Sequence, residues 1–323
     1  CNSAPVAVDD NLKGAKDTQL NIPAATLTSN DIDPDAGQTL SVSAVQNAIN
    51  GAVSISAGVV TFTPNAGFTG LASFEYVVSD GTAVDVGIVN LEIIPGISGS
   101  VSVGTGQTYT NLTNNDGLFQ ALNNDLILTG DLTVNITSDL TIETGNNALR
   151  NLTEQGAGAG TYRILIKPSG GPRTVSGDIA GELIKLNGAD RVTIDGWSGA
   201  VLSGPEPEGV AVTRDLTITN TSTNAFASMV FFYNGLGNPS QNNTIQNVNI
   251  VGNSTSYAGI AIGGNSGGLG GDNDNNKVLN CSIKSVSFGI YTQGQSEANP
   301  NLGTQIVDNV LNFTGADSVR RIG

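Results

Sequence analysis

The chain has 323 residues, with 28 acidic and 13 basic side chains, a net charge of -15 and no histidine. This charge disfavours nucleic acid and anionic membrane surfaces as partners. The missing histidine excludes His-based general bases, catalytic triads and His metal sites. The only two cysteines, Cys1 and Cys281, exclude zinc–thiolate sites, iron–sulfur clusters and a disulfide framework.

Residues 1–95 alternate apolar and polar side chains in short runs, as in Leu40–Val45 and Ser73–Val78. Turn pairs such as Asn50-Gly51 and Asp80-Gly81 separate these runs. About seven strands at this spacing predict an antiparallel β-sandwich.

A helix is expected at residues 114–123, with Asn115 or Asp116 as its N-cap. Its apolar residues Leu118, Phe119 and Leu122 share one face. Because this helix precedes the repetitive region, we expect it to cap the open end of that region.

The segment Ile94-Pro-Gly-Ile97 marks the boundary to a second domain, residues 96–323. Here short apolar triplets recur without hairpin turns, and the segments beginning at Asn243, Asn276 and Thr304 match one another at spacings of about 30 residues. This repeat predicts a parallel β-helix with Ile245, Val278 and Ile306 in one buried row. Asparagines at the turns are expected to form a hydrogen-bonded ladder.

Two features indicate a piece of a longer protein. The chain begins at Cys1 rather than Met, and no second cap follows Leu311. We therefore expect the native chain to continue beyond this sequence.

The first domain resembles the cadherin-like, immunoglobulin-like tandem repeats of bacterial surface adhesins. The stretches that carry the resemblance are Ala4–Asp10, Ser29–Asp35, Thr61–Gly70 and Phe74–Gly81. The second domain looks like the right-handed β-helix of large secreted proteins of the Bacteroidota, through Ile166–Gly171, Leu186–Gly196 and Leu216–Asn220. The resemblance implies type 9 secretion, an extracellular cell-surface location and an adhesive or structural role toward an unidentified glycan or protein.

A calcium site is the first candidate. Asp31, Asp33 and Asp35 alternate in one loop, and carboxylates at every second position supply the oxygens that calcium requires. The cadherin-like resemblance implies that Asp9, Asp10 and Asp80 approach from neighbouring strands. The alternative is a set of Asx-turns in a solvated loop. The acidic loop Gly270–Asn276 is a weaker candidate.

Two modification sites are also candidates. Cys1 followed by Asn-Ser is what signal peptidase II leaves in a lipoprotein, so lipidation would anchor the chain at the outer membrane. The alternative is a boundary within a longer chain. Asp317-Ser-Val319 fits an O-glycosylation triad at Ser318, or a plain exposed turn. Cys281 is expected to be a packed side chain rather than a reactive thiol.

The rival function is that of a polysaccharide lyase, glycosidase or carbohydrate-binding β-helix. Neither Asp190 with Asp195 nor Glu206 with Glu208 lies in a motif of those enzymes, and Lys277 and Lys284 suggest solvated turn residues. An ice-binding face would need the threonines at 217–223 to recur in later repeats, and they do not. The sequence therefore predicts a non-catalytic extracellular module.

Overall fold

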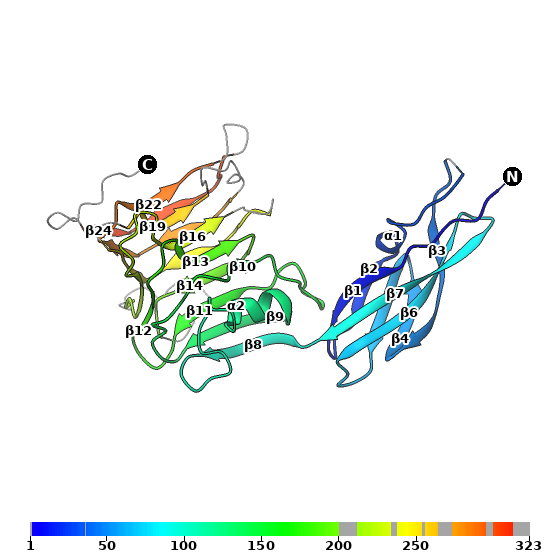
Figure 1. Ribbon diagram of the computed structural model, residues 1–323, viewed down its shortest axis with the longest axis horizontal. Coiled ribbons are helices and arrows are strands. Elements are labelled where there is room, and N and C mark those ends of the chain that lie inside the picture. The colour runs from blue at the N-terminus through cyan, green and yellow to red at the C-terminus, as the bar shows by residue number, and fades with distance from the viewer. Residues whose placement is uncertain are drawn as a thin grey trace. The chain divides into compact units, whose positions relative to one another are not determined.

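The computed structural model describes residues 2–35, 37–199, 212–233, 238–253, 256–263, 273–294 and 300–312. Within these ranges the chain is almost entirely β (Figure 1). It divides into two compact units. The first comprises residues 1–97, 125–130 and 153–160, and the second comprises 98–124, 131–152 and 161–323. No helix among the described residues is long and apolar enough to cross a membrane.

Two sheets form the first unit. The four-stranded sheet has the order β1-β7-β6-β3, and the three-stranded sheet has the order β2-β5-β4. The strands are β1 (Asp10–Ala15), β2 (Leu20–Pro23), β3 (Ser41–Ile49), β4 (Gly51–Ser56), β5 (Val59–Pro64), β6 (Gly70–Ser79) and β7 (Val84–Ile94). A four-residue helix, α1 (Ala24–Leu27), follows β2.

The core of the first unit lies between the two sheets. Alternation along β6 and β7 buries every second side chain, and the rings of Phe62 on β5 and Phe74 on β6 stack at 5.8 Å. The sheets are antiparallel except at one place, where β1 pairs with β7 in parallel. The expected all-antiparallel sandwich is therefore corrected to a mixed one, because β1 enters the sheet beside the last strand.

Segment 153–160 belongs to the first unit, where Gln155 binds the backbone at the end of β1 and in the turn that follows it. Its Oε1 accepts from the N–H of Ala15 at 2.8 Å, and its Nε2 donates to the carbonyl of Thr18 at 2.9 Å. Gln155 is 5% exposed. Leu128 and Glu154 add a parallel bridge within the same unit.

Three parallel sheets make up the rest of the fold. Their orders are β23-β20-β17-β14-β11-β9-β8, β12-β15-β18-β21-β24 and β10-β13-β16-β19-β22. From β11 onward, successive strands enter the three sheets in strict rotation, so that each set of three strands forms one rung.

The strands of the seven-stranded sheet are β8 (Gly96–Val103), β9 (Ile127–Ile136), β11 (Ile164–Pro168), β14 (Val192–Asp195), β17 (Thr244–Gln246), β20 (Lys277–Leu279) and β23 (Gln305–Val307). The second sheet contains β12 (Arg173–Gly177), β15 (Leu216–Asn220), β18 (Val248–Val251), β21 (Ser282–Lys284) and β24 (Val310–Asn312). The third contains β10 (Leu149–Arg150), β13 (Glu182–Asn187), β16 (Ser228–Tyr233), β19 (Ala258–Ile262) and β22 (Phe288–Thr292).

The register of the seven-stranded sheet agrees with the sequence repeat. Ile245 pairs with Val278, and Val278 pairs with Ile306. Ile245 and Val278 are fully buried, whereas Ile306 on the last described rung is 46% exposed. The predicted row is confirmed in its pairing, and its burial ends at that rung.

Buried asparagines connect the rungs at a turn, as the sequence predicted. The Oδ1 of Asn243 accepts from the N–H of Val192, and the Oδ1 of Asn276 accepts from the N–H of Asn243, both at 2.9 Å. Both asparagines are fully buried. Thr304 holds the equivalent place on the next rung, and its Oγ1 is buried without a hydrogen-bond partner.

The expected helix is present but shorter, as α2 (Leu118–Asn124), and it packs against β10. Leu118, Phe119 and Leu122 are buried, as predicted. The N–H groups of Leu118 and Phe119 donate to the carbonyls of Asn111 and Leu112. Backbone carbonyls of the preceding loop thus bind the first turn of the helix.

Candidate functional site

Three of the predicted calcium ligands have a carboxylate oxygen that is buried and without a hydrogen-bond partner. These atoms are Asp10 Oδ2, Asp31 Oδ2 and Asp33 Oδ2. A buried oxygen without a donor is costly, and a cation would compensate for it. The donor set therefore fits a hard cation in its chemistry.

The opposite oxygens of these carboxylates are held by the protein. Asp31 Oδ1 accepts from the N–H of Val8 at 2.7 Å and from the hydroxyl of Tyr76 at 2.8 Å. Asp10 Oδ1 accepts from the amide of Asn30 at 3.3 Å. These bonds bring the end of the N-terminal segment, the 29–35 loop and the fully buried Tyr76 together.

Electrostatic repulsion is visible in the pKa of Asp10. Burial, followed by the charge of Asp31, raises this pKa to about 6, although Asn30 opposes the rise. Burial and the hydrogen bond to Asp31 also raise the pKa of the Tyr76 phenol. Two carboxylates near each other in a partly buried place favour protonation or a bound cation.

The remaining predicted ligands are engaged elsewhere. Asp9 Oδ1 accepts from the N–H of Ile88 at 2.9 Å, and Asp35 Oδ2 accepts from the N–H of Ser3 at 2.5 Å. Asp80 Oδ1 accepts from the N–H groups of the turn that follows it.

Among the described residues, no group of three or more histidine, cysteine, aspartate or glutamate side chains is close enough to hold a metal ion. The Asx-turn alternative also has support, because Asp33 Oδ1 accepts from the N–H of Asp35 at 2.8 Å.

Other predicted sites divide into described and undescribed residues. Cys281 is fully buried, and burial raises its pKa to about 11, as expected for a packed side chain. Cys1, Ser318, Glu206, Glu208 and residues 270–272 of the second acidic loop lie outside the described residues.

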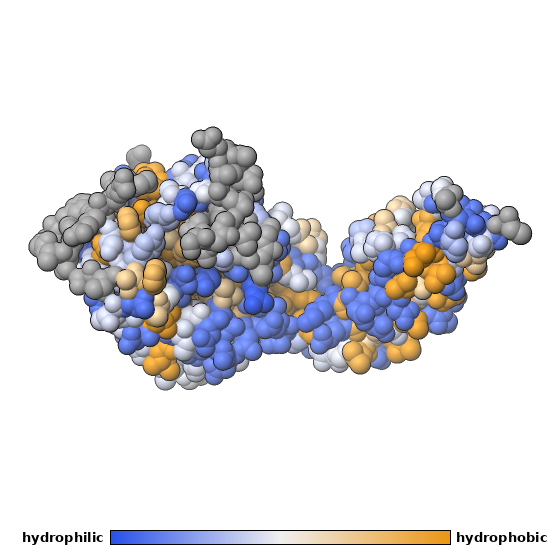
Figure 2. Space-filling model, turned by 45° about the horizontal axis from the view of Figure 1, so that its top comes forward, coloured by the Kyte–Doolittle hydropathy of each residue, from blue (hydrophilic) through white to orange (hydrophobic). Residues whose placement is uncertain are grey.

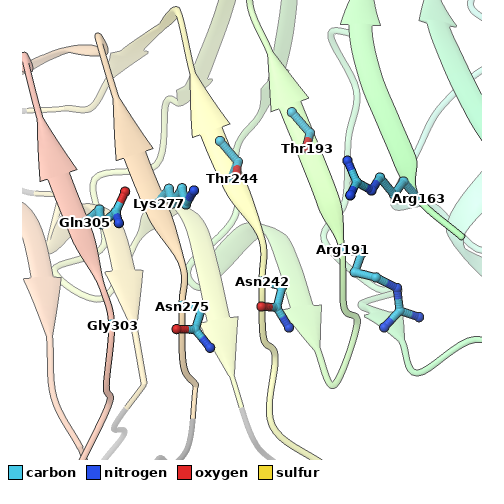
Figure 3. A pocket seen from close by; sticks show the side chains of 9 residues that line it. All are labelled: Arg163, Arg191, Thr193, Asn242, Thr244, Asn275, Lys277, Gly303 and Gln305. Atoms are coloured by element: carbon cyan, nitrogen blue, oxygen red, sulfur yellow. The ribbon is translucent and has the colours of Figure 1, made fainter. Parts of the chain in front are cut away.

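A groove of about 560 Å³, which the sequence pattern did not predict, lies on the outer face of the seven-stranded sheet. Two rows of side chains line it, each crossing neighbouring strands (Figure 3). The paired register puts four side chains in the first row: Thr193, Thr244, Lys277 and Gln305. Each of these four residues comes directly before an apolar residue of the row that contains Ile245 and Val278. Because successive side chains of a strand point to opposite faces, the four side chains point outward.

The second row lies two residues earlier on each strand, at a corner of the backbone. It contains Arg191, Asn242, Asn275 and Gly303, whose φ angles are 58°, 57°, 57° and 65°. Asparagine and glycine suit this left-handed conformation, whereas arginine is uncommon there. Arg163 holds the corresponding place one rung before Arg191.

The lining of the groove contains three cations, Arg163, Arg191 and Lys277, and no acidic side chain. This composition contrasts with the chain as a whole, in which acids outnumber bases by more than two to one. Lys277, expected to be a solvated turn residue, begins β20 and lines the groove instead. Only the alignment of rungs reveals this grouping, because its cations are far apart in sequence.

The carboxylates Asp190 and Asp195 bind turns of the same unit. Asp190 Oδ1 accepts from the N–H of Gln241 at 2.7 Å. Asp195 is 7% exposed, and its Oδ1 accepts from the N–H of Trp197 and from the amide of Asn247.

Exposed apolar side chains occur on the first unit, among them Val84, Val86 and Ile88 of β7. Figure 2 shows hydrophobic patches on the visible face of this unit.

Comparison with known proteins separates the two parts of the chain. No curated protein matches the sequence. Residues 1–93 match the family described as the cadherin-like domain. This match covers the two facing sheets and the carboxylate-bearing loop, and the first part of the chain is therefore a cadherin-like domain.

Proposed function

We propose that the chain is a non-catalytic structural and adhesive module of the bacterial cell surface. The observation that carries this proposal is a cadherin-like domain in the same chain as a stack of parallel sheets. Cadherin-like domains are associated with surface adhesion, and stacked rungs give an extended, stiff binding face. The engagement of Asp190 and Asp195 in turns adds support against glycosidase chemistry.

We infer further that residues 96–323 form a right-handed parallel β-helix. The rotation of successive strands through three parallel sheets supports this architecture. Right-handedness follows the strong preference of connections between parallel strands. Three further proposals concern export and modification. The chain would be exported by type 9 secretion, anchored through a lipid on Cys1 and glycosylated at Ser318.

A glycan incubation tests the function. The purified chain is mixed with acidic and neutral polysaccharides, with and without calcium, and both retention and reducing ends are measured. Saturable binding without new reducing ends or unsaturated products is expected. Product formation would show a lyase or hydrolase and would replace this proposal.

Calcium binding is the second proposal, and the unpaired oxygens of Asp10, Asp31 and Asp33 support it. In the described structure no three acidic side chains are close enough to hold the ion, so calcium would have to draw these carboxylates together. It would then neutralise their repulsion and order the loop. Binding to the folded state alone would raise stability by about 2.7 kcal/mol at a hundredfold excess over Kd.

The melting temperature of the full chain in EDTA and in millimolar calcium tests this proposal. We expect calcium to raise it in the wild type and not in Asp31→Asn. Asp17→Asn, in the turn between β1 and β2, is the matched control and should keep the response. An unchanged wild-type melting temperature would leave the Asx-turn interpretation.

A further inference from the structure

We propose that the groove on the seven-stranded sheet binds the carboxylate or sulfate groups of a linear acidic polysaccharide. The inference rests on the proposed adhesive function and names the ligand class for one face. Its first support is charge, because three cations and no acid line this groove in a chain of net charge -15.

The groove is long and polar. Its rows run from Arg163 to Gln305 over four strand intervals, or about 19 Å at the usual spacing of roughly 4.8 Å. Hydroxyl and amide side chains lie between Arg191 and Lys277, and they suit the hydroxyls of a sugar chain. A small anion would contact only part of this row, whereas a polymer with regularly spaced anions can reach the cations on both sides.

The cations are available to a ligand to different degrees. Arg163 is exposed, and Arg191 and Lys277 are partly exposed. The Nε of Arg191 donates to the carbonyl of Tyr162 at 3.0 Å, which orients its guanidinium.

Acids do lie beside the groove. Asp190 and Asp274 directly precede Arg191 and Asn275 in the sequence. The Oδ1 atom of each accepts a hydrogen bond from a backbone N–H of the next rung. They confine an anionic ligand to the row of cations and weaken each single contact. Affinity therefore has to come from several anions on one chain.

The backbone at Arg191 provides a second, independent observation. The equivalent positions on later rungs are Asn242, Asn275 and Gly303, which tolerate the left-handed conformation that Arg191 also adopts. An arginine at such a position opposes the local preference. Residues in disfavoured conformations concentrate at functional sites.

The repeat also supplies conservative variants. Arg191→Asn and Lys277→Thr replace each cation with the residue that a neighbouring rung carries at the same position, Asn242 or Thr244. This double variant should keep the fold and lose two charges. The matched control is Arg150→Gln with Lys284→Gln, which removes two exposed cations from the other sheets.

The test measures binding of the full chain to alginate, dextran sulfate, neutral dextran and single-stranded DNA at low and high salt. Wild type and control should bind an acidic polysaccharide in a salt-sensitive way. The double variant should lose at least about tenfold in affinity, or about 1.4 kcal/mol. The alginate and dextran sulfate arms distinguish carboxylate from sulfate recognition.

Three results would overturn the proposal: no binding of either acidic polymer, an equal loss in the control variant, or tighter binding of DNA. If the double variant does not fold, as judged by its circular dichroism and melting curve, Arg163→Gln is compared with Arg150→Gln in its place. Reducing ends measured in the same samples test the non-catalytic function separately. Product formation would overturn that function, whereas absent binding would overturn only the groove assignment.

Discussion

At the scale of single residues, buried carboxylates in the first unit and buried amides in the second have opposite effects. In the cadherin-like domain, carboxylates are forced together, and the pKa of Asp10 rises to about 6 through burial and the charge of Asp31. In the parallel sheets, buried asparagines satisfy backbone groups: the amide of Asn276 accepts from the N–H of Asn243 on the preceding rung and donates to the carbonyl of Asn273 on its own. Repulsion between buried carboxylates thus destabilises the first unit, and hydrogen bonds of neutral amides stabilise the second.

The Asp10 carboxyl makes the stability of the calcium-free protein depend on pH. Because its folded-state pKa is raised above the unfolded value, the folded state binds the proton more tightly. Stability from this group is complete below about pH 4 and falls as pH rises through about 6. In EDTA, the melting temperature of Asp10→Asn relative to wild type should therefore rise between pH 4.5 and 7. A constant difference would contradict the assignment. Taking the difference cancels carboxyls such as Asp80, whose pKa is lowered by the N–H of Ala83.

The asparagine ladder predicts a second effect at one residue. Asn276→Ala leaves the N–H of Asn243 and the carbonyls of Ser240 and Asn273 without their partners. We expect a loss of about 2 kcal/mol in unfolding free energy, measured with urea. The neighbouring exposed position supplies the control: Asn275→Gly suits the left-handed backbone and should be nearly neutral. Equal losses in both variants would contradict the ladder.

At the scale of elements, each rung of the parallel sheets is stabilised by the next. Strands of three residues, such as β17 and β20, cannot bury an apolar side chain alone. Stacking makes Ile245 and Val278 fully buried, whereas Ile306 on the last described rung is half-exposed. The contribution of an apolar residue therefore depends on its place in the stack.

The same isoleucine-to-alanine change should therefore lower the unfolding free energy by different amounts at two positions of the stack. Ile245→Ala removes buried methyl groups and should cost about 2–5 kcal/mol. Ile306→Ala, at 46% exposure, should cost about 1 kcal/mol or less. Chemical denaturation of the full chain checks the difference, and similar values would mean that the two sites share one environment in solution.

The sequence predicted features that depend on local periodicity and not those that depend on pairing across long distances. The spacing of Ile245, Val278 and Ile306 predicted that they pair across neighbouring strands. The alternation along β6 predicted which of its faces is buried. The parallel pairing of β1 with β7 has no local signal. The groove escaped prediction for the same reason, because only the register places Arg191 and Lys277 on one face of the sheet, with β17 between them.

At the scale of the whole molecule, the boundary in sequence differs from the boundary in space. The first unit takes in 125–130 and 153–160, and Gln155 binds backbone groups 140 and 137 residues away. Buried hydrogen bonds of this kind are costly to lose, because the backbone groups remain desolvated.

Removal of the Gln155 amide should therefore loosen the first unit. Gln155→Ala is expected to cost about 1–3 kcal/mol and to accelerate amide hydrogen exchange at Ala15. Gln46→Ala, which removes an exposed hydrogen bond to Glu75, is the control and should leave this exchange unchanged. Unaltered exchange at Ala15 in the first variant would show that Gln155 is dispensable.

The long sequence distance between Gln155 and its hydrogen-bond partners also affects when the first unit is completed during synthesis. Domains generally fold as units while the chain emerges, beginning at the N-terminus. Here the cadherin-like sheets are finished at Ile94, yet the backbone after β1 gains its last partner only when Gln155 has been made. Some sixty residues separate Ile94 from Gln155. At a synthesis rate of roughly 5–20 residues per second, the first unit therefore stays incomplete for several seconds. A nascent chain of this kind remains open to chaperones and export factors longer than its family match alone would suggest.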